Sequence, residues 1–204
     1  MPPLAGWTLW ITGFAGKVPV LDQVMKLLVS DYFIPVTISL IMLALWTGHP
    51  DRVRREQLQR TVMKAAVAIG ISTLFVKIID IHFTPWPRPY LVEDLAIRES
   101  AMRAAQVIFY MPLDPTFPGN AATISFAAAT GIWLGSRKAG TIIYILAFLW
   151  AFARLYAGVH FFVDILSGAV LGILTALFIS KVFMPWIEPL PSLCLRLSRF
   201  LYIA

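Results

Sequence analysis

The stretch "ARLYAGVHFFVDILSGAVLGILTALFISKVF", residues 153–183, decides the class of fold. Residues 162–184 are predominantly apolar, and a helix of this length crosses a hydrocarbon core of about 30 Å. Arg154, His160 and Asp164 stand immediately before this apolar run or at its start. Ionisable side chains are costly at membrane depth, so each of the three is a candidate functional residue. The stretch therefore predicts a membrane-spanning helix with a polar site at its first turn.

The composition of the whole chain indicates an integral membrane protein. Of its 204 residues, 59% are hydrophobic and only 14% are charged. The mean hydropathy of +0.77 lies outside the usual range of a soluble domain. The single cysteine, Cys194, excludes an internal disulfide and any metal site built from cysteines. Since no carboxylates converge on the basic residues, we expect neither a metal ion nor a cofactor, and we expect one domain over residues 1–204.

The apolar segments predict an all-α, polytopic membrane helix bundle. About five spans of roughly 16 to 23 residues are expected, and the shorter ones need tilt or a thin bilayer. The predicted spans are 31–47, 61–79, 121–136, 139–157 and 162–184. Two further segments, 18–32 and 93–110, mix apolar residues with charges at helical spacing, and they predict amphipathic helices lying in the membrane interface.

The distribution of charge predicts how the bundle is oriented in the membrane. Of the 17 lysines and arginines, ten lie in residues 48–64, in residues 136–140 or after residue 180. Such residues are retained on the cytoplasmic side, and five spans place these three regions on one side. The loop 80–120 and the turn 157–161 then open on the outer face. The net charge of +6 thus reflects orientation and gives no reason to expect a nucleic-acid partner.

His160 and Asp164 have the spacing of a histidine and its orienting carboxylate. They are four residues apart, which is one helical turn, so the carboxylate is expected to hold one ring nitrogen of the imidazole. A histidine fixed in this way serves as a base or a nucleophile, because the carboxylate selects its tautomer and stabilises the charge that develops on the ring. Arg154 lies six residues before His160, and Gly158 between them predicts a turn between two packed helices.

The other candidate residues would form an anion site on the same face of the membrane. Lys77 and Arg88 supply cations, and arginine offers a forked donor that fits phosphate oxygens. Gly119 and Asn120 lead directly into the predicted span 121–136, where free backbone N–H groups and the positive end of a helix dipole attract an anion. Together with the histidine cluster, these residues predict phosphoryl transfer through a phosphohistidine, with cationic stabilisation of the phosphoryl oxygens.

The sequence resembles the type 2 phosphatidic acid phosphatase superfamily of integral membrane lipid phosphatases. That family has three motifs, KxxxxxxRP, PSGH (often PSNH) and SRxxxxxHxxxD, and the resemblance covers about residues 21–183. The third motif is matched by "ARLYAGVHFFVD", with Ala153 in place of the serine. The resemblance implies that His160 is the nucleophile, Asp164 its orienting partner and Arg154 a phosphate ligand.

The first two motifs are matched less completely. Arg88 and Pro89 match the end of the first motif, but ten residues instead of six separate Lys77 from Arg88. Aligning "FPGNAATISF" with the second motif puts Gly119 at the serine and Ala121 at the histidine. In the family this histidine is the general acid that protonates the leaving group, so the resemblance implies that the chain lacks that acid.

Ala121 leaves several explanations open. The chain is a natural variant with impaired or lost turnover, or it is a form engineered from histidine to alanine to trap a bound state. A further explanation makes His82 a substitute acid. Whichever holds, hydrolysis should be least affected where the leaving group needs no proton, as when a phosphate leaves from a diphosphate.

The resemblance and the predicted topology imply a multi-pass lipid phosphatase of the cell membrane with its active site on the outer face. The first expected substrate is a polyprenyl diphosphate such as the undecaprenyl carrier, followed by phosphatidylglycerol phosphate or another lipid monoester. The expected partners are this lipid substrate and membrane lipids, and no obligate protein partner is evident. Two other classes stay open. One is a non-catalytic protein that binds or transports a lipid phosphate, and the other is a structural bundle that binds no phosphate.

Overall fold

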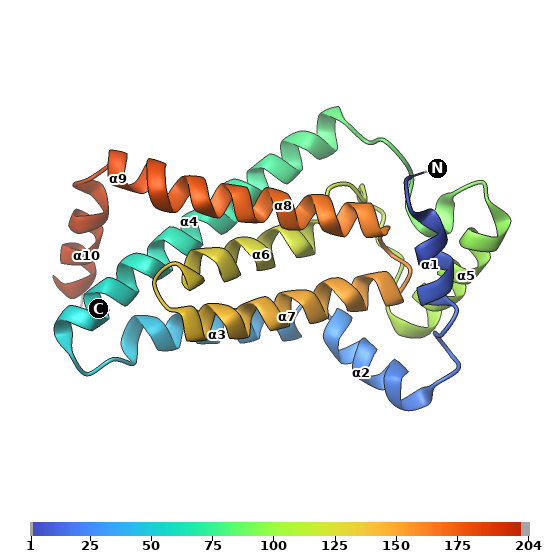
Figure 1. The fold of residues 1–204 in the computed structure, drawn as a ribbon, viewed down its shortest axis with the longest axis horizontal. Coiled ribbons are helices and arrows are strands. Elements are labelled where there is room, and N and C mark those ends of the chain that lie inside the picture. Colours follow the sequence, from blue (N-terminus) through green and yellow to red (C-terminus); the bar gives the residue numbers. More distant parts are fainter. Residues whose placement is uncertain (1, 201–204) are drawn as a thin grey trace.

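The protein is a bundle of helices in a computed structural model that describes residues 2–200. Helices α3, α4, α6, α7 and α8 form the body of the bundle, α1, α2 and α5 gather at one end, and α9 and α10 lie at the other (Figure 1). The elements are α1 (Ala5–Thr12), α2 (Pro19–Val29), α3 (Phe33–Thr47), α4 (Arg52–His82), η1 (Pro89–Leu91), α5 (Leu95–Ile108), α6 (Asn120–Trp133), α7 (Arg137–Tyr156), α8 (Phe162–Phe178), η2 (Ile179–Phe183), α9 (Met184–Trp186) and α10 (Leu190–Phe200).

Within residues 2–200, three helical segments are long and apolar enough to cross a membrane: α4, α7 and the continuous stretch Phe162–Trp186. Helices α2 and α3 are joined by a 54° bend and add a fourth crossing if they act as one span. The other two predicted spans correspond to α3 and α6, which have 15 and 14 residues and are shorter than a crossing helix needs. The expected all-α membrane bundle is therefore confirmed, with three of the predicted spans at full length.

Helix α6 lies at the centre of the bundle and packs against α4, α7 and α8. Its sequence, NAATISFAAATGIW, is rich in small residues, which let neighbouring backbones approach closely. Gly168 and Gly172 lie one turn apart on the face of α8 that meets α6. A Cβ atom on Gly172 would lie 2.2 Å from the carbonyl oxygen of Thr123, and one on Gly168 would lie 2.3 Å from that of Gly119. These small residues therefore fix where the first turn of α6 lies against α8.

The three regions rich in lysine and arginine lie at the end of the bundle that carries α10 (Figure 1). They are residues 48–64, residues 136–140 and the segment after residue 180. Arg54 donates from Nη2 to the carbonyl oxygen of Gly135 at 3.4 Å, and Arg60 donates from Nη1 to Glu188 Oε1 at 2.7 Å. These bonds join the start of α4 to the α6–α7 turn and to the segment before α10. The α4–α6 connection and the α7–α8 turn lie at the opposite end. The loops are thus grouped at two ends, as the charge pattern predicts.

Three short helices cover this opposite end. Helices α2 and α5 correspond to the amphipathic helices predicted at 18–32 and 93–110, whereas α1 is an element that the sequence pattern does not predict. In α1, Thr12 Oγ1 lies 2.8 Å from Ser100 Oγ of α5. Asp22 of α2 accepts a hydrogen bond of 2.7 Å from the hydroxyl of Tyr156 at the end of α7. Polar contacts therefore attach all three helices to the body of the bundle or to one another.

Replacing Gly172 by alanine is expected to destabilise the bundle, because the new methyl carbon would stand 2.2 Å from the carbonyl oxygen of Thr123. The expected loss in the free energy of unfolding is about 1–3 kcal/mol, the usual cost of overpacking. Thermal unfolding of the purified protein in detergent measures this loss. Gly70→Ala is the matched control, since its methyl group meets nothing within 4 Å and should raise stability slightly. Equal unfolding temperatures for the two variants would contradict the tight α6–α8 contact.

Candidate active site

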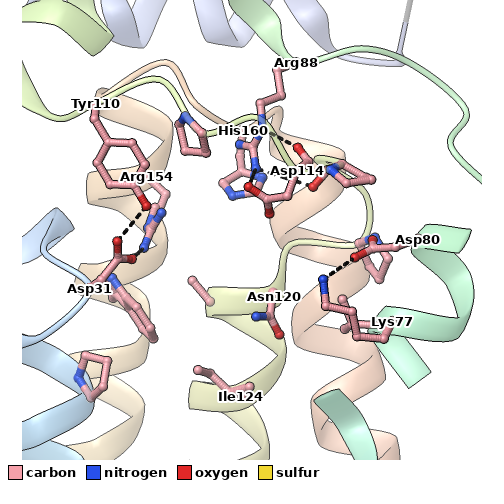
Figure 2. A pocket seen from close by; sticks show the side chains of 17 residues that line it. Asp31, Lys77, Asp80, Arg88, Tyr110, Asp114, Asn120, Ile124, Arg154 and His160 are labelled. Atoms are coloured by element: carbon pink, nitrogen blue, oxygen red, sulfur yellow. Dashed lines mark hydrogen bonds and ion pairs between the residues drawn. The ribbon is translucent and has the colours of Figure 1, made fainter. Parts of the chain in front are cut away.

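A cavity of about 300 Å³ lies at the end of the bundle where α1, α2 and α5 gather, and Figure 2 shows the side chains that line it. Six of the eight predicted site residues line it: Lys77, Arg88, Asn120, Ala121, Arg154 and His160. The other two, Gly119 and Asp164, are buried but do not belong to the lining. Segments far apart in the sequence therefore bring most of the predicted site together in one cavity.

His160 lies in the turn between α7 and α8, and its side chain is buried. Its Nδ1 is 3.1 Å from the carbonyl oxygen of Thr116 and 3.0 Å from the hydroxyl oxygen of the same residue. Because a carbonyl oxygen can only accept, Nδ1 carries the proton and donates it. Nε2 is then the nitrogen with the free lone pair, on a ring that lines the cavity. This is the tautomer that a nucleophilic histidine needs.

Asp164 does not hold the imidazole by a direct hydrogen bond, and this part of the prediction was wrong. Its Oδ2 lies 3.8 Å from His160 Nδ1, and the hydroxyl of Thr116 links the two by donating to Oδ2 at 2.6 Å. Phe161 is the N-cap of α8, so His160 precedes the helix and the one-turn spacing does not apply. Asp164 also accepts hydrogen bonds from the backbone N–H of Phe161 at 2.7 Å and from the indole of Trp86 at 2.9 Å.

The chain reverses between Arg154 and His160, as the sequence predicts. Arg154 lies in the last turn of α7, and Gly158 has a φ of +68°, a left-handed conformation that favours glycine. A Cβ atom on Gly158 would also lie 2.8 Å from the Cα of Ala101 in α5. Helix α5 therefore packs directly on the turn that positions His160.

Burial lowers the pKa of the His160 imidazole below its ordinary value of 6.5. The Asp164 carboxylate acts in the opposite direction and raises this pKa, whereas the positive charges of Arg88 and Arg154 lower it further. Burial is the largest of these influences. The imidazole is therefore neutral at pH 7, with a lone pair available for attack.

Arg88 is 4% exposed and holds three loop segments together. Its Nε donates to the carbonyl oxygen of Asp114 at 2.8 Å, Nη1 to that of Val159 at 2.7 Å and Nη2 to that of Pro115 at 3.4 Å. Nη2 also pairs with Asp114 Oδ1 at 3.1 Å. Since Val159 directly precedes His160, the guanidinium stands beside the imidazole, where an anion site requires it.

Arg154 faces the same cavity from the end of α7. Its Nη2 pairs with Asp31, which also accepts a hydrogen bond of 2.8 Å from the hydroxyl of Tyr110. The guanidinium carbon lies 4.8 Å from the ring centroid of Phe109 and 5.4 Å from that of Trp150. Within the described part of the chain, its buried Nε has no hydrogen-bond partner. This N–H is therefore an unsatisfied buried donor on a residue that lines the cavity.

Lys77 is the most exposed of the three cations, with 61% of its side chain accessible, and its Nζ lies 3.5 Å from Asp80 Oδ2. The spacing of the family motif would put its lysine at position 81. Lys77 precedes that position by four residues, which is one turn of α4, because the helix continues to His82. The longer spacing between Lys77 and Arg88 thus shifts the lysine by one turn and still leaves it in the cavity lining.

Every cation in the cavity lining faces a carboxylate of the same lining (Figure 2). The pairs are Lys77 with Asp80, Arg88 with Asp114, and Arg154 with Asp31. The positive charges are therefore balanced in the structure. A phosphate that enters must compete with these carboxylates for the same donors.

The start of α6 agrees with the prediction only in part. Asn120 and Ala121 form its first turn and line the cavity. Gly119 does not offer its N–H to an anion, because this group donates to the backbone carbonyl of Asp164 at 2.8 Å. Ala121 contributes a methyl group and no titratable atom. His82 is exposed and lies outside the lining, so its position does not favour a role as substitute acid.

Thr116 and Trp86 are functional candidates that sequence reasoning missed. Trp86 stands two residues before Arg88, and Thr116 stands two residues before Pro118 at the start of the second motif. Their proximity to matched motifs is the signal that could have found them. The expectation that no carboxylates converge on the basic residues was wrong, because Asp31, Asp80 and Asp114 line the cavity and pair with its three cations.

Comparison with known proteins identifies a family match and two curated relatives. The family model described as "PAP2 superfamily" matches residues 61–188, which contain all eight predicted site residues. Undecaprenyl-diphosphatase BcrC of Bacillus subtilis is 25% identical over 187 residues, which are 92% of this chain and 87% of that protein. Bacitracin transport permease protein BcrC of Bacillus licheniformis is 36% identical over 67 residues, 33% of this chain. The chain spans only 33% of the length of this second relative.

The fold is also similar to that of a solved structure. The crystal structure of Aquifex aeolicus LpxE aligns with a TM-score of 0.60 and 26% sequence identity, covering 86% of this chain and 93% of that chain. The similarity therefore extends well beyond the three motifs.

The acid limb of the pH profile for kcat/KM is expected to have its midpoint below 6.5, because attack requires neutral His160 and burial lowers the pKa of its imidazole. Hydrolysis of a lipid diphosphate in detergent micelles across the acid range measures this midpoint. Asp164→Asn should move the midpoint to still lower pH, since it removes the carboxylate that raises the pKa. A wild-type midpoint at or above 6.5 would contradict the assignment.

Thr116→Val is expected to lower kcat by about tenfold or more, because it removes the hydroxyl that links Asp164 to His160 and leaves a buried carboxylate oxygen short of a donor. The carbonyl of residue 116 still accepts from Nδ1, so the tautomer is retained. Thr73→Val is the matched control, since its hydroxyl donates to the carbonyl of Ile69 and to no other group among residues 2–200. The link through Thr116 has no role in turnover if the two variants have the same kcat.

Proposed function

The chain belongs to the PAP2 superfamily, and from this premise we propose that it hydrolyses a lipid phosphate or diphosphate through a phosphohistidine at His160. The observation that carries the proposal is the convergence of the His160 imidazole with Arg88 and Arg154 in one cavity. A nucleophilic nitrogen beside two guanidinium groups is the arrangement that phosphoryl transfer requires.

In the first step, Nε2 of His160 attacks the terminal phosphorus. A P–N bond forms while the bond between phosphorus and the leaving oxygen breaks, and the leaving group takes the electron pair. The ring becomes positively charged, and the Asp164 carboxylate stabilises this charge through the Thr116 hydroxyl. The guanidinium groups of Arg88 and Arg154 stabilise the phosphoryl oxygens.

In the second step, water attacks the phosphorus on the side opposite to His160. A P–O bond forms, the P–N bond breaks, and its electron pair returns to Nε2. One proton of the water passes to solvent or to the departed lipid oxygen, and inorganic phosphate leaves. Substrate and water are thus converted to a dephosphorylated lipid and phosphate, and the protein returns to its initial state.

Ala121 makes the turnover of monoesters slow. An alkoxide is a poor leaving group unless it receives a proton, and losing a general acid costs about 10²- to 10⁴-fold in rate. A phosphate that leaves from a diphosphate carries its own negative charge and hardly needs the proton. The chain therefore acts on diphosphates better than on monoesters.

A polyprenyl diphosphate, with the undecaprenyl carrier first, is the substrate that fits best. The relative from Bacillus subtilis that matches 92% of this chain is an undecaprenyl-diphosphatase. The leaving group in that reaction is a lipid monophosphate, so the reaction tolerates alanine at position 121. A lipid monoester is the second choice, because it needs the acid that Ala121 does not supply.

The cavity opens on the outer face of the cell membrane. The support for this orientation is the bias of lysine and arginine, which concentrate at the end of the bundle opposite to the cavity. A substrate that carries its diphosphate in the outer leaflet then reaches His160 directly.

A non-catalytic protein that binds or transports a lipid phosphate is the second candidate function. Two observations favour it: Ala121 stands where the family has its acid, and each cation of the cavity pairs with an aspartate. The name of the Bacillus licheniformis relative also refers to transport. This candidate predicts lipid-phosphate binding without release of inorganic phosphate.

Ala121→His is expected to raise the rate of phosphate release from a lipid monoester by about 10²- to 10⁴-fold, because it restores a proton donor at the leaving group. The rate on a lipid diphosphate should change much less. Purified protein is incubated with each substrate in detergent micelles, and released inorganic phosphate is measured. The ratio of the two rates is the decisive quantity.

Ala121→Gln is the control, since glutamine fills similar space and does not titrate. Its rates should stay near those of the unsubstituted chain on both substrates. If the Ala121→His variant folds but releases phosphate no faster, this result contradicts the alignment of Ala121 with the family's acid. Absence of phosphate release by every form, together with retained binding of a lipid diphosphate, supports the second candidate.

A further inference from the structure

A separate cavity of about 230 Å³, here called the distal cavity, lies at the end of the bundle opposite to the catalytic cavity. Helix α4 contributes two cations to it, Arg60 and Lys64. The rest of the lining comes from α9, from the start of α10 and from the segment between them, and it consists of Met184, Pro185, Glu188 and Pro191. None of these residues lines the catalytic cavity, so the distal cavity is a different site.

The two cations of the distal cavity differ in their partners. They are four residues apart on α4 and therefore share one face of the helix. Arg60 donates from Nη1 to Glu188 Oε1 at 2.7 Å and from Nη2 to Ser192 Oγ at 2.9 Å, which fastens the start of α10 to α4. Lys64 is half-buried and makes no ion pair or hydrogen bond with any residue that the structure describes. Lys64 is thus the cation that can meet an anion from outside the protein.

The position of Lys64 along α4 brings it to the level of the lipid headgroups. Helix α4 has 31 residues and is therefore about 46 Å long, whereas the hydrocarbon core is about 30 Å thick. Its apolar part is the predicted span 61–79, and Lys64 lies near the start of that part. A lysine at this depth extends its ammonium group toward the phosphates of the adjacent leaflet.

Helix α10 has the character of a helix that lies on a membrane surface. It runs across the end of the bundle instead of along the spanning helices (Figure 1). It packs on α4, and Leu195 is only 2% exposed. Four large apolar side chains on another face of α10 are 56% to 78% exposed, and they are Leu190, Leu193, Leu197 and Phe200. Their spacing of three and four residues makes one apolar stripe, which a lipid leaflet would cover.

We propose that the distal cavity binds the phosphate headgroup of an anionic phospholipid in the leaflet that covers the apolar stripe of α10. Charge complementarity supports a lipid of this kind, because ten lysines and arginines but only three acidic residues lie in residues 48–64, in residues 136–140 and after residue 180. Under the proposed orientation this is the cytoplasmic leaflet. The inference does not depend on the catalytic mechanism, since it uses none of the catalytic residues.

The lining of the distal cavity favours an anionic headgroup over a zwitterionic one. Lys64 and Arg60 together carry two positive charges against the single carboxylate of Glu188, so the lining has an excess of one positive charge. The phosphate oxygens accept from the Lys64 ammonium group, and the Glu188 carboxylate opposes their binding. A headgroup that also carries an ammonium group would place its positive charge beside these cations. Phosphatidylglycerol should therefore bind more tightly than phosphatidylcholine.

Lys64→Gln tests the inference through a reporter close to the distal cavity. Cys194 is exposed, is the single cysteine of the chain and lies about one turn after Pro191, so a fluorophore attached to it responds to lipid at this end. Purified protein in detergent is titrated with short-chain phosphatidylglycerol. We expect Lys64→Gln to raise the apparent Kd by about fivefold or more. Lys138→Gln is the matched control, because it also removes one positive charge at this end but lies outside the distal cavity; its Kd should stay within about twofold.

A second variant acts in the opposite direction and serves even if Lys64→Gln fails to fold. Glu188→Gln keeps an oxygen that accepts from Arg60 but removes the negative charge from the lining. The apparent Kd for phosphatidylglycerol should therefore fall. Phosphatidylcholine, titrated into the unsubstituted protein, should bind at least about fivefold more weakly than phosphatidylglycerol.

The outcomes decide both the site and the ligand. Equal Kd values for Lys64→Gln and Lys138→Gln overturn the site, as does a Kd that is unchanged or raised in Glu188→Gln. Equal binding of the two phospholipids overturns recognition by charge. Inorganic phosphate that produces the same fluorescence change at the same concentration assigns the distal cavity to a free anion and overturns the lipid. Each readout is lipid binding, so a failure of the proposed phosphatase activity would not affect this test.

Discussion

The end of the bundle that contains the catalytic cavity depends on the hydrogen bonds that the buried Asp164 carboxylate accepts. Its oxygens accept hydrogen bonds from Thr116, from Trp86 and from the backbone N–H of Phe161, and its own carbonyl oxygen accepts the N–H of Gly119. The residue is fully buried, so these donors must offset most of the cost of taking a charge out of water. Two distant segments, the loop that contains Trp86 and the loop 116–119, are fixed to the start of α8 as a result. The imidazole is therefore oriented before any substrate binds, which is the condition for electrostatic preorganisation.

The three cations of the cavity differ in how freely they can meet a phosphate. Arg88 is held by three backbone carbonyls in addition to Asp114, so its position does not depend on its carboxylate partner. Arg154 has a buried Nε without a partner among the described residues, and Lys77 is largely exposed. A phosphate dianion offers these donors more charge than an aspartate does and can accept two parallel hydrogen bonds from arginine. Under the proposed function, Arg88 is therefore the fixed element of the site, and we expect the other two cations to exchange a carboxylate for the substrate.

The sequence predicts the class of fold and most of the cavity lining, because both depend on local signals. Long apolar runs define membrane helices, and the spacing around Arg154, His160 and Asp164 is a short motif. The link through Thr116 is not predictable in this way, since Thr116 and His160 are 44 residues apart and meet only through the packing of α6 on α8. The expected direct hydrogen bond between Asp164 and His160 was wrong for a related reason, although the two groups lie 3.8 Å apart. Two residues four positions apart lie one turn apart only when both are inside a helix. The spacing of the motif does not show whether α8 begins before or after His160.

The alanine at position 121 bears on the identity of the leaving group. Asn120 and Ala121 form the first turn of α6 and line the catalytic cavity, so under the proposed mechanism the leaving group lies beside this turn. The backbone N–H groups of a first helical turn have no partners within their helix and favour negative charge. Under the proposed mechanism, a departing phosphate needs no proton at this turn, whereas a departing alkoxide still needs one. The position of Ala121 therefore agrees with the proposed preference for a diphosphate.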